Sequence, residues 1–174
     1  MPNYLDEMAS KAGEILRPNR FRMKLFFPTI IGAQQASDLS EFFVLSSEAP
    51  AKTLGILEVP VTGGHVYKVP GDTVVPDWNC TMILDSNMTI YKALMRWQEF
   101  CNSLQSGLRA NDLSLYGSAE LSQLDGINQV VQTWELLKIF PTEVSPITYS
   151  KESRDELGQT DVSFAINDIV TNLT

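Results

Sequence analysis

The sequence contains few of the residues from which catalytic and metal sites are built. Histidine occurs once, at His65, and cysteine twice, at Cys80 and Cys101. A structural zinc site takes about four Cys or His ligands, whereas these three residues fall on three separate expected elements. Both cysteines lie on expected apolar faces, where cysteine behaves as a small hydrophobic residue. We therefore expect no metal, no cofactor, no Cys–His nucleophile pair and no disulfide framework.

Motifs that bind phosphate are also missing. Gly63-Gly64 is not followed by an expected helix, and Gly71-Asp72 lacks the lysine of a phosphate-binding loop. The acidic pairs Asp6-Glu7 and Asp155-Glu156 fall in an expected helix and a charged loop, where solvation accounts for them. We expect no catalytic residues and a protein that is not an enzyme.

Positive charge is scarce. The chain has 13 basic and 21 acidic residues, a formal net charge of -8, and its one basic group is Arg17, Arg20, Arg22 and Lys24. Proteins that grip nucleic acid usually show the opposite balance. The charge disfavours tight nucleic-acid binding, but it is compatible with a surface along which nucleic acid passes without sticking.

Long apolar runs are absent. No segment approaches the roughly 20 apolar residues that span a bilayer. The first residues, Met1 to Met8, do not show a basic stretch followed by an apolar one. We expect no signal peptide, no membrane anchor and a cytoplasmic compartment.

The residues that are present predict one folded domain over 1–174. Hydrophobic residues make up 44% and charged residues 20%, as in ordinary globular proteins. A chain of this length buries a core without disulfides or metal. The three tryptophans, Trp78, Trp97 and Trp134, fall on patterned segments and are expected in the core or in contacts.

Hydropathy patterns predict mostly antiparallel strands. Alternation indicates strands at Phe21–Phe27, Glu41–Ser46, Trp78–Asp85, Asn128–Phe140 and Thr160–Asn167. Helical spacing indicates one central helix, Thr89–Leu104, begun by Asp85-Ser86-Asn87 and stopped near Gly107, and an N-terminal helix or arm within 1–17. The segment Ser106–Asp125 is expected to be mostly loop, Pro141–Pro146 a turn and 169–174 a tail. The fold class is α+β, mainly β, with an antiparallel sandwich or barrel flanked by the helix.

A hairpin over 53–72 is the most informative feature. Gly63-Gly64 separates two strand-like segments and tolerates the positive φ angles of a two-residue hairpin turn. Pro60 and Pro70 cannot donate backbone hydrogen bonds, so the hairpin cannot lie in the middle of a sheet. We expect it to project or to lie at an edge, as a docking surface.

Several short segments stand out in one order along residues 16–168: Leu16-Arg-Pro-Asn-Arg-Phe21, Ala49-Pro50, Val59-Pro60-Val61, Val69-Pro-Gly-Asp72, Asp77-Trp78, Arg96-Trp97-Gln98, Leu137-Lys-Ile-Phe-Pro-Thr-Glu-Val144 and Val162-Ser-Phe-Ala165. Together they resemble the tail tube proteins of contractile-tailed bacteriophages. Ile139-Phe140 departs conservatively from the family's Leu-Trp, while the 106–125 segment and the end of the chain differ more.

The resemblance implies a structural subunit that forms hexameric rings, which stack into the conduit for DNA ejection from a virion tail. It implies as partners the sheath, the baseplate hub or tube initiator, the tape-measure protein and the tube terminator, with phage DNA passing through unbound. Expected inter-ring contacts are Leu57, Val59, Pro60, Val61, Tyr67, Val69 and Pro70. Expected bore-lining residues are Asp161, Ser163 and Asn167, from alternation.

Other interpretations of the sequence stay open. Within the same fold, the chain is alternatively a baseplate protein that initiates the tube or the tube of a bacterial contractile injection system. In a different class, it is a small β-barrel hydrolase or ligand-binding barrel, with His65 as the residue to test.

Overall fold

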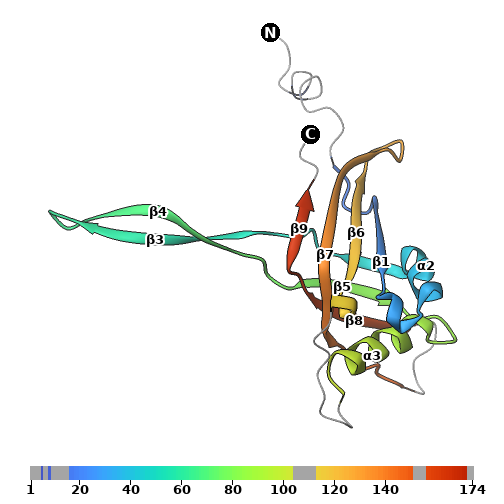
Figure 1. Ribbon diagram of the computed structural model, residues 1–174. Coiled ribbons are helices and arrows are strands. Elements are labelled where there is room, and N and C mark those ends of the chain that lie inside the picture. Colours follow the sequence, from blue (N-terminus) through green and yellow to red (C-terminus); the bar gives the residue numbers. More distant parts are fainter. Residues whose placement is uncertain (1–4, 6–7, 9–15, 104–112, 151–155, 172–174) are drawn as a thin grey trace.

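The body of the protein is an antiparallel sheet with two helices packed on it (Figure 1). This computed structural model describes residues 5, 8, 16–103, 113–150 and 156–171. Its strands are β1 (Phe21–Phe26), β2 (Val44–Ser47), β5 (Trp78–Ile83), β6 (Gly117–Leu124), β7 (Val130–Val144), β8 (Gln159–Ala165) and β9 (Asp168–Thr171). Its helices are α2 (Gln34–Phe43) and α3 (Thr89–Cys101), with 3-10 turns η1 (Thr29–Ile31) and η2 (Leu113–Leu115).

Strand β7 joins two halves of the sheet. Its first part pairs with β6 and β9, and its last part pairs with β8. The order along the main path is β1-β6-β7-β8-β5-β2. At the bend, Lys138 has φ 53° and is an extra residue opposite β6, which is a bulge that turns the strand. The Asn167 side chain donates to the Lys138 carbonyl at 2.7 Å, where β8 likewise gives way to β9.

The core lies between this bent sheet and α3. Helix α3 buries Ile90, Ala93, Leu94 and Trp97 against strand residues that alternate inward, such as Trp78, Cys80, Met82, Val162 and Phe164. The Trp97 indole donates to the Leu115 carbonyl at 2.7 Å, and the Trp78 indole donates to the Glu48 carbonyl at 2.8 Å. Both tryptophans are buried as expected, and Trp134 is half-buried at the core's edge.

Helix α2 covers the outer edge of β1. The Leu25 amide donates to the Ser40 hydroxyl at 2.9 Å, and the Phe27 amide donates to the Ser37 hydroxyl at 3.1 Å. Both serines are buried. At Leu25 and Phe27 these hydroxyls take the place of a neighbouring strand, so this part of the β1 edge is not open to another chain.

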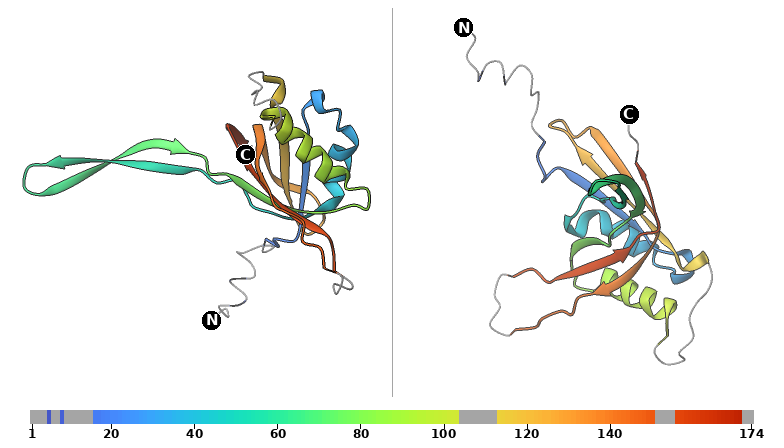
Figure 2. Two further views of the ribbon diagram at one scale, coloured as in Figure 1. Left: turned by 90° about the horizontal axis from the view of Figure 1, so that it is seen from below. Right: turned by 90° about the vertical axis from the view of Figure 1, so that its left-hand side faces the viewer.

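The hairpin forms a separate two-stranded sheet of β3 (Thr53–Val61) and β4 (His65–Val74) and projects far from the body (Figures 1 and 2). The chain enters the hairpin after β2 and returns from it into β5. Pairing of Val61 with His65 leaves three residues in the loop, Thr62 to Gly64, rather than the expected two. Gly63 and Gly64 both have positive φ, as expected.

The fold class and the projecting hairpin are confirmed, but several element boundaries were wrong. The polar segment before Val44 is helix α2, so β2 begins at Val44 rather than Glu41. The expected loop contains β6, and the expected turn after Pro141 is the end of β7, because an edge strand tolerates proline. The expected tail contains β9. The expected N-terminal helix or arm lies outside the described residues except for residues 5, 8, 16 and 17. The expected helix stop at Gly107 and residues 151–155 of the charged loop lie outside them as well.

Candidate assembly surfaces

The outer part of the hairpin, residues 56–70, which we call the distal hairpin, has one apolar face and one mixed face. Residues opposite each other in the ladder point to the same side, and successive pairs alternate. One face therefore carries Leu57 with Val69, Val59 with Tyr67, and Val61 with His65 at the tip. The other face carries Ile56 with Pro70, Glu58 with Lys68, and Pro60 with Val66. We call these the apolar face and the mixed face.

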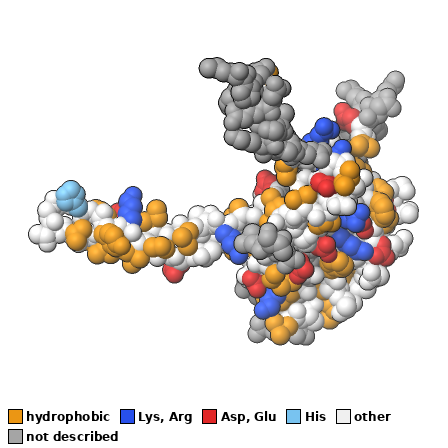
Figure 3. Space-filling view, turned by 90° about the horizontal axis from the view of Figure 1, so that it is seen from above, with side chains coloured by type: hydrophobic (Ala, Val, Ile, Leu, Met, Phe, Trp, Pro, Cys, Tyr) orange, Lys and Arg blue, Asp and Glu red, His pale blue; other side chains and the backbone are white. Residues whose placement is uncertain are grey.

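The apolar face is exposed and has no partner in the described chain. Leu57 is 60% and Tyr67 66% exposed, although such side chains are normally covered. Figure 3 shows hydrophobic side chains along the hairpin out to the histidine at its tip. The mixed face instead holds an ion pair, with Lys68 Nζ 3.7 Å from Glu58 Oε1. Five of the expected contact residues lie on the apolar face, and Pro60 and Pro70 lie on the mixed face.

Two glycines, Gly55 and Gly71, lie where the distal hairpin joins the rest of β3 and β4. The ladder register shifts between Leu54 and Ile56, at Gly55. A Cβ on Gly55 would lie 3.1 Å from the Asp72 carbonyl oxygen, and one on Gly71 would lie 3.1 Å from the Gly55 carbonyl carbon. The two strands therefore approach more closely here than side chains would allow.

A second surface is the polar outer face of β5 and β8. The Thr81 hydroxyl donates to Asp161 Oδ1 at 2.6 Å, and the Ser163 hydroxyl donates to Asn79 Oδ1 at 2.7 Å. Asn79 in turn donates to Glu48 Oε2 at 3.1 Å. These two sets of bonded side chains, which we call the polar network, hold small polar and acidic groups and no lysine or arginine.

Two of the three expected bore residues, Asp161 and Ser163, lie in this polar network. Asn167 continues the alternation but lies at the bend, where its side chain is bonded to Lys138. Asn79 and Thr81 belong to the same surface, although nothing in the sequence singles them out. They meet Ser163 and Asp161 because of the antiparallel register of β5 with β8, which the sequence pattern does not specify.

Open strand edges form a third surface. In the described ladders, β2 pairs only with β5, and the last part of β7 pairs only with β8. These two strands bound the four-stranded half of the sheet that carries the polar network. Each presents backbone groups that a strand of another chain can pair with.

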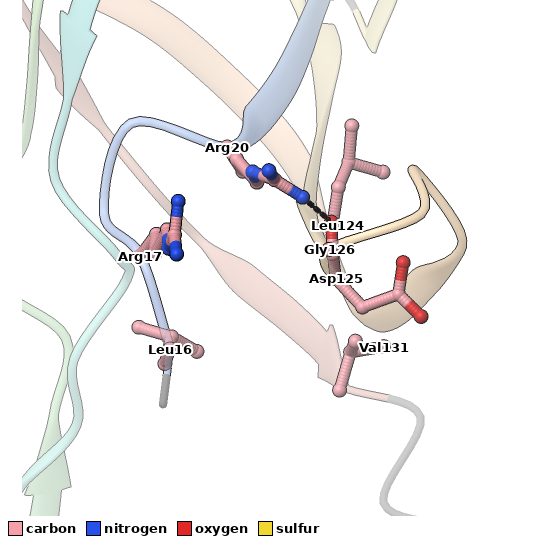
Figure 4. A pocket seen from close by; sticks show the side chains of 7 residues that line it. All are labelled: Leu16, Arg17, Arg20, Leu124, Asp125, Gly126 and Val131. Carbon is pink, nitrogen blue, oxygen red and sulfur yellow. Dashed lines mark hydrogen bonds between the residues drawn. The ribbon is translucent and has the colours of Figure 1, made fainter. Parts of the chain in front are cut away.

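A small pocket lies where β1 begins, beside the turn between β6 and β7 (Figure 4). It encloses about 100 Å³ and is lined by Leu16, Arg17, Arg20, Leu124, Asp125, Gly126 and Val131. Arg20 Nη1 donates to the Asp125 carbonyl at 2.8 Å and ties the two segments together. The pocket contains no nucleophile with an adjacent base, so it offers no catalytic chemistry.

The residues that chemistry would need are far apart or inert. His65 is at the hairpin tip, whereas Cys80 is buried in the body. Burial, with a smaller contribution from Asp161, raises the pKa of the Cys80 thiol to about 12, and burial also raises the pKa of Cys101. Neither thiol is therefore available as a thiolate near neutral pH. Among the described residues, no group of His, Cys, Asp and Glu is arranged to hold a metal ion.

No helix in the described ranges has the length and apolar character needed to cross a membrane.

The fold is shared with chains of contractile injection particles. A chain of the sheath-tube complex of the extracellular contractile injection system PVC, in its extended state, aligns over 98% of both chains, with 13% identity and a TM-score of 0.65. A chain of the PVC sheath/tube terminator aligns over 91% of this chain and 97% of that one, with 13% identity and a TM-score of 0.65.

A third similar structure is the tube-terminating cap of the anti-feeding prophage. One of its chains aligns over 95% of this chain and 99% of that chain, with 16% identity and a TM-score of 0.64. No family model matches the sequence, and neither does any curated protein. At these identities the similarity establishes a common fold, that of chains in tube-bearing contractile particles.

Proposed function

We propose that this chain is a structural subunit of the tail tube of a contractile particle, assembling into hexameric rings that stack. The observation that carries the proposal is the apolar face of the hairpin, which projects from the body with no partner among the described residues. Burying that face on a subunit of the next ring removes apolar surface from water and stabilises the stack. The shared fold, which covers nearly the whole chain, supports the same role.

Ring closure uses the open strand edges. Strand β2 of one subunit and the last part of β7 in its neighbour differ, so pairing them is a head-to-tail contact that closes into a ring when the rotation fits. The β1 edge is occupied by Ser37 and Ser40 and does not compete. Six such contacts would join the four-stranded halves into one continuous barrel.

The polar network would then line the bore. Its acidic groups, Glu48 and Asp161, repel phosphate, and the network holds no cation to trap it. In a phage tail, DNA passes this surface during ejection without specific binding. The partners of such a tube are the sheath, the baseplate hub or initiator, the tape-measure protein and the terminator, in a virion tail assembled in the bacterial cytoplasm.

A second candidate is a chain that starts or ends a tube. It is favoured by the terminator and the cap, whose TM-scores match that of the sheath-tube complex. A tube of a bacterial injection system is the remaining alternative within this fold. A tube subunit elongates by itself, whereas a terminator binds only to tube ends.

Charged substitutions on the hairpin test the stacking contact. Val61→Asp with Val69→Asp places two charges on the apolar face and should leave a folded subunit that forms rings but does not elongate, because burying unpaired charge is costly. Deletion of Gly63-Gly64 should act in the same way. Tube length is measured by negative-stain electron microscopy, and folding by circular dichroism.

Val66→Asp is the matched control, since Val66 lies on the mixed face beside the Glu58–Lys68 ion pair. It should shorten tubes much less than the paired substitutions do. Tubes of normal length from the Val61→Asp, Val69→Asp variant would remove the stacking role from this face. His65→Ala should leave assembly largely intact.

A further inference from the structure

An open groove lies between α2 and α3, on a side of the molecule that the proposed ring and stacking contacts leave free. It encloses about 320 Å³. Four of the residues that line it are small, Gly32, Ala33, Ala36 and Ala93, and they leave room for the backbone of another chain. Two cations, Lys92 and Arg96, stand along the α3 wall. They are four residues apart and so lie on the same side of the helix.

Arg96 is exposed and makes no hydrogen bond or ion pair within the described residues. Lys92 Nζ donates to the Asn87 carbonyl at 2.8 Å, which holds it at the groove without neutralising it. Glu99, one turn beyond Arg96, forms no ion pair with it within the same described ranges. The α3 wall of the groove is therefore positively charged.

The acidic residues of α2 are used elsewhere. Asp38 Oδ1 lies 3.6 Å from Lys24 Nζ, and Glu41 Oε1 lies 3.3 Å from Arg22 Nε, so both carboxylates face β1. Asp85, before α3, keeps its charge, but its carboxylate accepts hydrogen bonds from Thr89 and is not among the groups that line the groove. The groove thus keeps a positive charge although the whole chain has a formal charge of -8.

The orientation of the groove follows from the packing of α3. Its residues Ile90, Leu94 and Trp97 contact the core side of β5 and β8, whose other side carries the polar network. If that network lines the bore, as proposed above, the helices and their groove face the outside of the tube. A protein that surrounds the tube would meet this groove first.

We propose that the groove between α2 and α3 binds an acidic segment of the sheath protein. A carboxylate would form a bidentate pair with the Arg96 guanidinium, and a second one would meet the Lys92 ammonium. The inference rests on the proposed function, because it takes its orientation from the bore. Charge complementarity selects the occupant, since acidic side chains are attracted here and repelled by most of this chain's surface.

The test uses tubes of the full-length chain and the sheath protein encoded at the same locus. Sheath that co-sediments with tubes is quantified for the wild type, for Arg96→Glu and for the double variant Lys92→Glu, Arg96→Glu. Arg17→Glu is the matched control, because it makes the same change of charge far from the groove. A double-stranded DNA fragment is tested on the same tubes as a second ligand.

The expected result is that wild-type and Arg17→Glu tubes bind sheath equally, while Arg96→Glu tubes bind it about tenfold more weakly or worse. Sheath binding by the wild type should also fall at high salt. The inference is overturned if Arg96→Glu tubes bind sheath like the wild type, or if the groove binds DNA instead. If the wild-type chain forms no tubes, the proposed function fails and this inference fails with it.

Discussion

At the scale of single residues, Gly117 shows most clearly how the fold constrains the sequence. It begins β6 beneath α3, where an added Cβ would lie 2.5 Å from the Phe26 carbonyl oxygen and 2.6 Å from Cη2 of Trp97. Neither the β1 backbone nor a fully buried tryptophan can move cheaply. The glycine is therefore required by close packing rather than by its backbone angles.

Gly117→Ala should lower the free energy of unfolding by about 1–3 kcal/mol, the usual cost of overpacking a core. Urea denaturation followed by tryptophan fluorescence measures it. Gly158→Ala is the control, since its Cβ would meet Leu84 Cβ at an ordinary 3.7 Å. Equal stabilities of the two variants would contradict the packing argument.

Asp85 supplies the cap that α3 otherwise lacks. Its two carboxylate oxygens accept from the Thr89 amide and the Thr89 hydroxyl, each at 2.7 Å. Burial raises the pKa of Asp85, but these hydrogen bonds and backbone amides outweigh it and leave the pKa below its ordinary 3.8. Its stabilising effect is thus present above the unfolded pKa and is lost as pH falls through the folded pKa.

Asp85→Asn should destabilise the protein by about 1 kcal/mol at pH 7. The difference from the wild type should shrink as pH falls below about 4. Thermal unfolding at pH 7 and pH 3 measures both, with exposed Asp72→Asn as the control. A difference that stays constant across this range would show that the Asp85 charge has no part in the cap.

At the scale of elements, the contact of α2 with β1 decides which edges of the sheet stay open. Ser37→Ala and Ser40→Ala each leave a buried β1 amide without a partner, which should cost about 1–3 kcal/mol apiece. Chemical denaturation measures the loss, and Ser46→Ala, exposed on β2, should stay within about 0.5 kcal/mol of the wild type. Wild-type stability of both serine variants would contradict the edge-covering role.

The same helix shows why part of the fold could not be predicted from the sequence. Its fully buried residues are Ala36, Ser37 and Ser40, and its larger apolar residues Leu39 and Phe43 are only partly buried, so its inward face is short and half polar and gives periodicity little to detect. Strand β6 was missed because its buried residues are Ala119, Leu121 and Ser122, so only one large apolar side chain marks its inward face. Strands β1, β5 and β8 were predicted because their inward residues are large, apolar and strictly alternating.

The hairpin was predictable for the opposite reason. Its prolines exclude it from the middle of a sheet, and Gly63-Gly64 marks its turn. What the sequence could not give was the pairing register, which places Leu57, Val59 and Tyr67 on one face and the ion pair on the other. Register depends on the three-residue loop and on the bulge in which Gly71 and Asp72 lie opposite Gly55, and the sequence pattern specifies neither.

At the scale of the whole molecule, the surfaces differ in kind. The hairpin offers an apolar face, the helices offer a cationic groove, and the sheet offers a polar face and open edges at β2, at β9 and at the last part of β7. A small domain with two unlike edges and a projecting apolar ribbon satisfies both requirements of a stacked ring, which are lateral closure and axial repetition.

Electron microscopy of the purified chain at high concentration is the most direct test of the central claim. We expect six-fold rings that stack into open tubes, with the hairpin of each subunit seated on the adjacent ring. A protein that stays strictly monomeric under all conditions, with neither rings nor tubes, would contradict the account.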